Sequence, residues 1–449
     1  MAFQVGYAQM NINPPLGIFV HGYYIDRFAE GFLDDLQASA MALKCGEKTI
    51  LMLAVDNCLL RTPITDAYRQ KIAQATGVEA NCVFICASHT HTGPEVSIKP
   101  DVAENIREYT AFLGRRLADV ATMALADLKT AKMGFIYGWA PERVAYIRRY
   151  KMKDGSIMTC PPINDPGIDH AIGTLDQRVN VLRFDREGAE SIVLVNYGVH
   201  ADTVNGNLIS ADWPGWMRST LEKALDGMKC MFFPGAEGDV GSTNVHPKPG
   251  DMNDTEISFD NEMKSPGMAR FVGRALAGTV LQVYDKIEYT EVESIDCVRK
   301  TLRIPTNMPT KEQLPLAHKY KQLHDAGRDD LIPYTAMELT TVVAEAIRMC
   351  ELENGPAYID LTLTGVRIGN VALVGIPGEP FTDVGVALKE AEGWDIILPC
   401  AMTNGYEGYF PMKSAFDEGG YEARTSRYQA GVAERIIVGG RELLEEMKR

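Results

Sequence analysis

The sequence lacks the features that a membrane-spanning or nucleic-acid-binding protein needs. No uncharged apolar run approaches the ~18 residues that cross a bilayer, and the longest runs, such as 50–55, have the length of a strand. The N-terminus has no basic region followed by an apolar stretch, as a secretory signal would. The 45 Lys and Arg residues are outnumbered by 60 Asp and Glu residues, and the net charge of -15 disfavours phosphate backbones and anionic lipid. We therefore expect a cytoplasmic protein with no transmembrane segment and no nucleic-acid partner.

Cysteine-rich and phosphate-binding motifs are missing too. The nine cysteines have neither the spacing of a disulfide framework nor that of a zinc knuckle, so we interpret them as reduced, mostly buried thiols. There is no Gly-x-Ser-x-Gly elbow, no Walker loop and no His-Glu-x-x-His helix. The glycine-rich residues 235–241 have the wrong spacing for a dinucleotide loop and carry two carboxylates where phosphate would bind.

What remains is a chain of 449 residues that is 46% hydrophobic and can bury a large core. Periodicity predicts strands at 48–56, 82–87, 133–137, 191–199, 358–368, 371–376 and 396–398, and helices at 62–77, 102–128, after 214, at 339–350, near 384 and from about 426. This alternation predicts an α/β fold with a central sheet flanked by helices. No linker, repeat or low-complexity tract divides the chain, so residues 1–449 are expected to form a single domain.

The most informative segment is Ser-His-Thr-His-Thr-Gly-Pro at 88–94, which directly follows a predicted strand. Residues two apart in an extended chain point to the same side, so His89 and His91 can approach one small target. Imidazole is the commonest transition-metal ligand, and the whole chain has only eight histidines. On this segment alone, a metal site and a polar turn that merely ends the strand are both open.

Two other predicted strands are also followed by side chains that can bind a metal ion. His200 follows the strand at 191–199, and the nearby Asp202 and Asp212 can either hold the second nitrogen of a ligating imidazole or cap the next helix. Glu379 follows the strand at 371–376 in a Pro-Gly-Glu-Pro segment, where it is either a metal ligand or a charge at a helix N-terminus.

These segments occur in the order expected of the neutral/alkaline non-lysosomal ceramidase family, and the resemblance covers nearly the whole chain. Residues 89–94 resemble the family signature His-Thr-His-Ser-Gly-Pro, whose first histidine binds zinc. His200 resembles the second zinc histidine, Glu379 the glutamate ligand in Pro-Gly-Glu, and Tyr409 the tyrosine ligand in Tyr-x-x-Tyr. The resemblance implies a neutral-ceramidase-like catalytic domain of layered central mixed β-sheets flanked by helices. It also implies one catalytic Zn²⁺ held by His89, His200, Glu379 and Tyr409.

The resemblance implies further pocket residues, with some departures. Tyr421 stands in a Tyr-Glu pair and Arg148 in an arginine motif that resemble pocket segments of the family, although the asparagine that precedes the family's arginine is replaced. The family's catalytic serine lies in a Gly-Asn/Asp-x-Ser-Pro-Asn loop, but here Gly241 takes that place and Ser242 substitutes only after a shift of one residue. The chain ends soon after the last motif, so we expect no C-terminal immunoglobulin-like domain and a substrate other than ceramide.

The activity expected from these residues is that of a zinc-dependent hydrolase that cleaves an amide, ester or lactone bond in a small soluble substrate. Such a ligand set leaves room for water, whose pKa zinc lowers to about 7 so that it can attack a carbonyl. Tyr421 and Arg148 are expected to stabilise the oxyanion, each contributing about 3 kcal/mol. His91 is expected to carry the proton to the leaving group.

Two other functions stay open at this point. One is a ceramidase-type amidase that acts on N-acyl sphingoid lipids, and the other is a non-catalytic, metal-dependent binding protein. A mixed nitrogen and oxygen ligand set also suits Mn²⁺ or Fe²⁺. The sequence leaves open a second ion near Asp212 and Asp239, as well as homo-oligomerisation.

Overall fold

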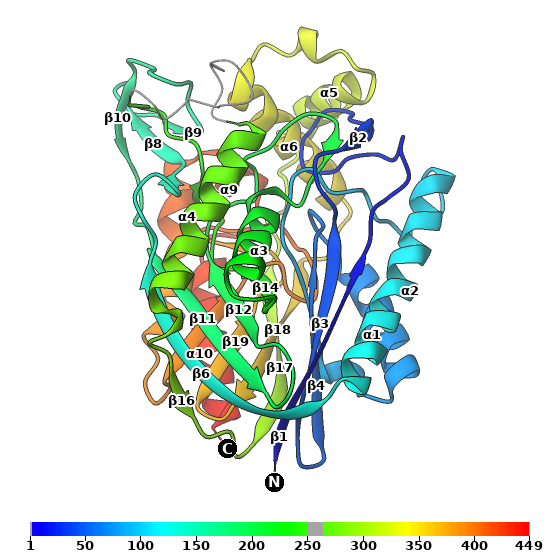
Figure 1. The fold of residues 1–449 in the computed structure, drawn as a ribbon. Helices are drawn as coiled ribbons and strands as arrows, with labels where there is room; N and C mark the ends of the chain where they lie inside the picture. Colours follow the sequence, from blue (N-terminus) through cyan, green and yellow to red (C-terminus); the bar gives the residue numbers. More distant parts are fainter. Residues whose placement is uncertain (1, 249–263, 449) are drawn as a thin grey trace.

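A large mixed sheet dominates the computed structural model, which describes residues 2–248 and 264–448 (Figure 1). Its order is β14-β12-β11-β6-β1-β3-β4-β5, with β16 also paired to β6. The nine strands are β1 (Phe3–Asn11), β3 (Gln37–Cys45), β4 (Lys48–Val55), β5 (Val83–Ala87), β6 (Lys129–Trp139), β11 (Arg178–Arg186), β12 (Ile192–Tyr197), β14 (Lys229–Pro234) and β16 (Glu288–Thr290). The β4–β5 and β12–β14 pairs at the two ends are parallel, and the pairs between them are antiparallel.

A second, four-stranded sheet packs against the end strands of the first. Its order is β17 (Ile295–Pro305), β18 (Tyr358–Ile368), β19 (Val371–Gly375) and β21 (Ile396–Cys400). The large sheet curves so that the rings of Phe84 in β5 and Phe233 in β14 contact each other in a tilted arrangement, with centroids 5.5 Å apart. The Asn196 side chain of β12 donates to the Pro399 carbonyl of β21 at 2.9 Å. This packing brings segments from both sheets together at one end of the molecule.

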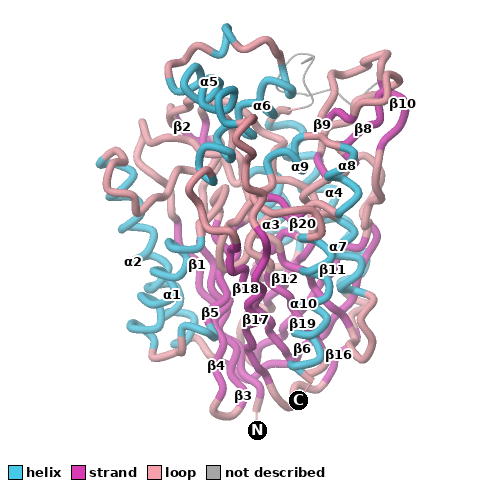
Figure 2. Tube along the Cα trace, turned by 180° about the vertical axis from the view of Figure 1, so that it is seen from behind, coloured by secondary structure: helices cyan, strands magenta, loops and turns pink. Residues whose placement is uncertain are grey.

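Helices cover both sheets (Figure 1). Helix α2 (Glu104–Ala126) packs on β1 and β3 and also on α1 (Thr62–Thr76), while α3 (Asp212–Ala224) and α4 (Pro266–Tyr284) pack on each other and on β14, β6 and β11. Seen from behind, α7 (Thr382–Lys389) and α10 (Val432–Met447) lie over the four-stranded sheet (Figure 2). In the described ranges, no helix is both long and apolar enough to cross a membrane.

The α/β class with mixed sheets is confirmed, and several predicted segments have nearly their observed bounds. Strand β18 spans the predicted residues 358–368, and α1 ends at Thr76, directly before Gly77, whose φ of 74° allows its N–H to reach the Ala73 carbonyl. The closing helix begins at Val432 rather than near 426, because a separate short helix, α9 (Tyr421–Thr425), precedes it. Strand β3 was not predicted: it is alanine-rich and buried along almost its whole length, so it shows no alternation of polar and apolar residues.

A buried ion pair joins α3 to the large sheet. Asp56, directly after β4, accepts hydrogen bonds from both terminal nitrogens of Arg218, at 2.8 and 2.5 Å, and another from the Gln37 N–H at 2.9 Å. Both charged groups are almost completely buried. Their pairing therefore compensates a large desolvation cost, and Asp56 has a structural role.

Removing the cation of this pair should destabilise the fold. The Arg218→Met variant leaves the Asp56 carboxylate buried without its partner, and we expect it to lower the free energy of unfolding by ~3–5 kcal/mol. Urea unfolding followed by circular dichroism measures this loss. As a control, Arg328→Met breaks an exposed pair with Asp330 and should leave the midpoint unchanged. An unchanged midpoint for Arg218→Met would show that the buried pair does not hold α3.

Candidate metal centre

His89 and His91 lie in the loop that follows β5, but not in an extended chain as the sequence analysis assumed. The strand ends at Ala87, and His89 has a φ of 65°, in the left-handed region. The chain turns at this point, and the two rings still meet, with their Nε2 atoms 3.4 Å apart. The His91 N–H donates to the Ala201 carbonyl at 3.0 Å. This bond ties the loop to the segment that carries His200.

The side chains of His89, His200 and Glu379 converge from three distant segments. Glu379 Oε2 lies 2.9 Å from His200 Nε2 and 3.4 Å from His89 Nε2. One ligand atom from each of the three buried residues lies within 4.8 Å of the other two. The described structure thus brings together three of the four residues predicted to bind zinc in a group that could hold an ion.

Backbone carbonyls fix the orientation of both imidazoles. His89 Nδ1 lies 2.7 Å from the Cys58 carbonyl, and His200 Nδ1 lies 2.9 Å from the Val240 carbonyl. A carbonyl oxygen only accepts, so each Nδ1 carries a proton and donates it. In the neutral rings the lone pair is then on Nε2, the atom that faces Glu379.

Two tyrosines complete the surroundings of Glu379. The Tyr406 hydroxyl donates to Glu379 Oε1 at 2.8 Å. Tyr409, the fourth predicted ligand, lies opposite Glu379 where β20 (Glu379–Pro380) pairs with β22 (Tyr409–Phe410). Burial raises the pKa of Tyr409, while the Arg148 charge opposes this rise.

The geometry and charge of the cluster suit a divalent transition-metal ion. Two ligand atoms at 2.0–2.1 Å from a tetrahedral zinc ion are about 3.3 Å apart. Glu379 Oε2 lies at similar distances, 2.9 and 3.4 Å, from Nε2 of His200 and Nε2 of His89. Burial lowers the pKa of His89, but the Glu379 carboxylate outweighs it and holds the pKa well above its usual value. The same pairing holds the pKa of Glu379 well below its usual range against the effect of burial. The centre therefore favours a positive charge beside the carboxylate.

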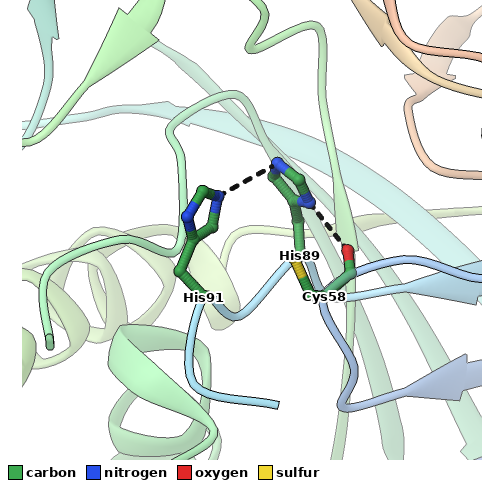
Figure 3. A group of neighbouring side chains, drawn as sticks. All are labelled: Cys58, His89 and His91. Atoms are coloured by element: carbon green, nitrogen blue, oxygen red, sulfur yellow. Dashed lines mark hydrogen bonds between the residues drawn. The ribbon is translucent and has the colours of Figure 1, made fainter. Parts of the chain in front are cut away.

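A second group that could hold an ion contains Cys58, His89 and His91, so it shares His89 with the first (Figure 3). Figure 3 shows the His89 ring between its two neighbours, with Nδ1 directed to the Cys58 carbonyl and Nε2 to His91. Burial raises the pKa of the Cys58 thiol, which disfavours the thiolate that a metal needs. The group with Glu379 is the better candidate.

All eight predicted site residues line two cavities that share part of their walls. A cavity of about 500 Å³ is lined, among others, by His91, Arg148, His200, Ser242, Tyr409 and Tyr421. A smaller one of about 290 Å³ is lined by His89, Glu379 and Tyr406, and also by His91, Tyr409 and Tyr421. The candidate metal centre therefore lies where a small molecule can reach it.

Arg148 and Tyr421 present donors to this space. Arg148 donates to Glu422 at 2.8 Å and to the Gly238 carbonyl at 2.8 Å, and its third nitrogen lies 3.2 Å from His200 Nε2. The Tyr421 ring lies edge-on to Tyr409, with centroids 5.5 Å apart. Burial raises the pKa of Tyr421, so its hydroxyl stays protonated and can donate.

The second ion considered near Asp212 and Asp239 finds no support. The Asp212 carboxylate accepts from the N–H groups of Thr203, Val204 and Trp213. Asp239 accepts from the N–H and the hydroxyl of Thr382 at 2.8 and 2.9 Å. Neither belongs to a possible metal group in the described part of the chain, and both carboxylates have local structural partners.

The sequence analysis named Asp202 and Asp212 as candidates to hold the second nitrogen of a ligating imidazole, but backbone carbonyls take that place at His89 and His200. Asp202 Oδ1 instead lies 3.8 Å from His91 Nδ1 and accepts from the Tyr23 hydroxyl, while Oδ2 accepts from Lys264. Sequence reasoning missed Tyr23 and Lys264, which come from distant segments without a signal. Glu237 is buried, and its two carboxylate oxygens have no hydrogen-bond partner among the described residues. Its only signal was the glycine-rich loop at 235–241.

The Tyr406–Glu379 hydrogen bond should strengthen metal binding. In Tyr406→Phe the bond is lost and Glu379 is less firmly oriented, so we expect zinc to bind ~10–100-fold more weakly, as measured by competition with a chromophoric chelator. The matched control is Tyr428→Phe, because the buried Tyr428 hydroxyl makes no hydrogen bond to the described residues. Equal zinc affinity in Tyr406→Phe and the wild type would contradict this role.

Comparisons with known proteins give the fold. No protein-family model matches the sequence, and no curated protein matches it. The neutral ceramidase from Pseudomonas aeruginosa has a similar structure, with a TM-score of 0.73 and 18% identity over 100% of this chain and 75% of that one. A ceramidase complexed with C2 also has a TM-score of 0.73, with 16% identity over 100% of this chain and 76% of that one. The neutral-ceramidase-like fold that the motifs implied is thus confirmed.

Proposed function

We propose that this protein is a zinc-dependent hydrolase that cleaves an amide, ester or lactone bond in a small soluble substrate. The observation that carries the proposal is the convergence of His89, His200 and Glu379, three buried ligands at the wall of a cavity. Two imidazoles and a carboxylate form a donor set typical of catalytic zinc. The similarity in fold to proteins named ceramidases supports a reaction of the same class. The proposal treats residues 1–449 as one catalytic domain.

In this proposal His89, His200 and Glu379 hold the ion, with Tyr409 as the fourth protein ligand. When bound, zinc supplies a Lewis acid that lowers the pKa of a water molecule to about 7 and polarises a carbonyl. The protein contributes rigidity, because Tyr406 holds Glu379. Backbone carbonyls hold both imidazoles, so little reorganisation is needed on binding.

Other side chains of the cavity then stabilise charge and move a proton. The Arg148 guanidinium, fixed by Glu422 and the Gly238 carbonyl, and the Tyr421 hydroxyl stabilise the negative charge that develops on the substrate oxygen, each by about 3 kcal/mol. His91 carries the proton to the leaving group, and Asp202 faces its Nδ1. Ser242, in the wall of the same cavity, is the candidate for the family's serine.

The cavity bears on the choice of substrate. Its volume of about 500 Å³ lies in the range of small-molecule sites, which favours a compact amide, ester or lactone. Apolar side chains such as Ile25, Ile163 and Met337 line part of it. This lining supports the second candidate, an amidase that acts on N-acyl sphingoid lipids.

A cytoplasmic location belongs to the same proposal, because all nine cysteines are free.

The metal content of the purified protein tests the centre of the proposal. Protein prepared without added metal should contain close to one zinc per chain, measured by elemental analysis, and Glu379→Gln and His89→Ala should lose it. Their kcat/KM should also fall by at least ~10²-fold, since electrostatic stabilisation is usually the largest catalytic contribution. The exposed His170 is the matched control, and His170→Ala should keep its zinc. Unchanged zinc in both cluster variants would remove the basis for the proposed chemistry.

A substrate panel separates the candidate functions. We expect zinc-loaded protein to hydrolyse small lactones or amides faster than N-acylsphingosines, because the cavity is compact. Release of the acid or amine is measured by chromatography, with zinc-free protein as the blank. Turnover of the sphingoid lipids alone would favour the ceramidase-type amidase. Stoichiometric zinc without hydrolysis of any panel member would favour a metal-dependent binding protein.

A further inference from the structure

Two cysteines meet where the two sheets pack together, and neither lines the cavities of the metal centre. Cys82 ends the 3₁₀ turn η1 (Ala80–Cys82) before β5, and Cys297 lies in β17. The Cys297 thiol donates to the Asn81 carbonyl at 2.8 Å. Because this carbonyl carbon is bonded to the nitrogen of Cys82, the Cys297 sulfur lies against the Cys82 backbone. Both cysteines are free, and their side chains are close enough to shift each other's pKa.

Polar contacts on either side hold the two segments in place. Lys48 Nζ lies 2.9 Å from Asp296 Oδ1, and Arg299 donates to the Asn81 side-chain oxygen at 3.2 Å. Cys297 is partly exposed, whereas Cys82 is buried among the apolar side chains against which Cys297 packs. The two segments are therefore held side by side, and Cys297 is within reach of a small molecule from solvent.

The charges around the pair favour a thiolate. The neighbouring Cys297 side chain and the Lys48 ammonium lower the pKa of the Cys82 thiol against burial. The two thiols influence each other, so the proton that is lost first belongs to the pair. The thiolate is the reactive form of cysteine.

We propose that Cys82 and Cys297 are a redox modification site, a thiol pair that hydrogen peroxide converts to a disulfide between the two sheets. This inference rests on the packing of η1 against β17, and it holds whether or not the protein is a hydrolase. It also agrees with a reducing environment, in which protein disulfides are usually transient or redox-sensing.

The chemistry uses one equivalent of peroxide. The thiolate of the pair attacks a peroxide oxygen, the O–O bond breaks, and that cysteine becomes a sulfenic acid while hydroxide leaves and is protonated to water. The second sulfur of the pair then attacks the oxidised sulfur, loses its proton and displaces hydroxide, which becomes the second water. In total the two thiols lose two electrons, and one peroxide is reduced to two waters.

The cross-link would join parts of the chain that are distant in sequence. It spans 215 positions of the chain, from residue 82 to residue 297, and it ties η1, the turn that leads into the edge strand β5 of the large sheet, to β17 of the smaller one. Cross-links that close long loops restrict the unfolded chain strongly. The oxidised protein should therefore unfold at a higher temperature than the reduced protein.

Peptide mapping after mild oxidation tests the inference. The reduced protein is treated with equimolar hydrogen peroxide at neutral pH, its free thiols are alkylated, and it is digested without reductant. We expect a cross-linked pair of peptides containing Cys82 and Cys297, about 2 Da lighter than their sum because two hydrogens are lost. Thermal unfolding of the same sample should show a higher Tm that dithiothreitol reverses.

Variants identify the sulfurs involved. Cys82→Ala should lose the cross-link, whereas Cys86→Ala, which changes a neighbouring buried thiol in β5, should keep it. Cys297→Ala should lose the cross-link as well. The inference is overturned if both thiols of the wild type remain open to alkylation after peroxide treatment, or if the cross-link survives in Cys82→Ala.

Discussion

The buried carboxylate of Glu379 is the group on which the arrangement of the candidate site depends. Its side chain is completely shielded from solvent, and a buried charge without partners is too costly to keep. The protein supplies partners on both oxygens, with Tyr406 on Oε1 and the imidazoles of His89 and His200 on Oε2. Segments that are hundreds of residues apart must therefore meet at this carboxylate, and the two sheets provide the place.

The packing of the sheets explains how this meeting occurs. His89 follows β5 and His200 follows β12, which lie near opposite ends of the large sheet, while Glu379 follows β19 of the smaller sheet. The curvature of the large sheet brings its two ends together against the smaller one. Carbonyl groups of Cys58 and Val240, next to the strands, then orient the imidazoles. The ligands are thus positioned by backbone, which is more rigid than side chains of a surface loop.

Local patterns predicted much of the fold and the identity of the cluster, because both rest on short-range information. Strand β18 shows its bounds in its own composition, and His89, His200 and Glu379 each stand in a short motif at the end of a predicted strand. What could not be predicted depends on contacts between distant segments. The left-handed turn at His89, the second-nitrogen partners of both imidazoles, and the Tyr23 and Lys264 side chains that meet at Asp202 are of this kind. Strand β3 belongs with them, since burial on both faces removes the alternation on which strand prediction relies.

The proposed chemistry requires that a metal ion binds beside the Glu379 carboxylate in the active protein. Anomalous diffraction from crystals grown with zinc, collected on both sides of the zinc absorption edge, tests this most directly. The account predicts a single strong peak, about 2.0–2.2 Å from Nε2 of His89, Nε2 of His200 and Oε2 of Glu379. A peak bound by other residues, or no peak with the three side chains still in contact, would contradict it.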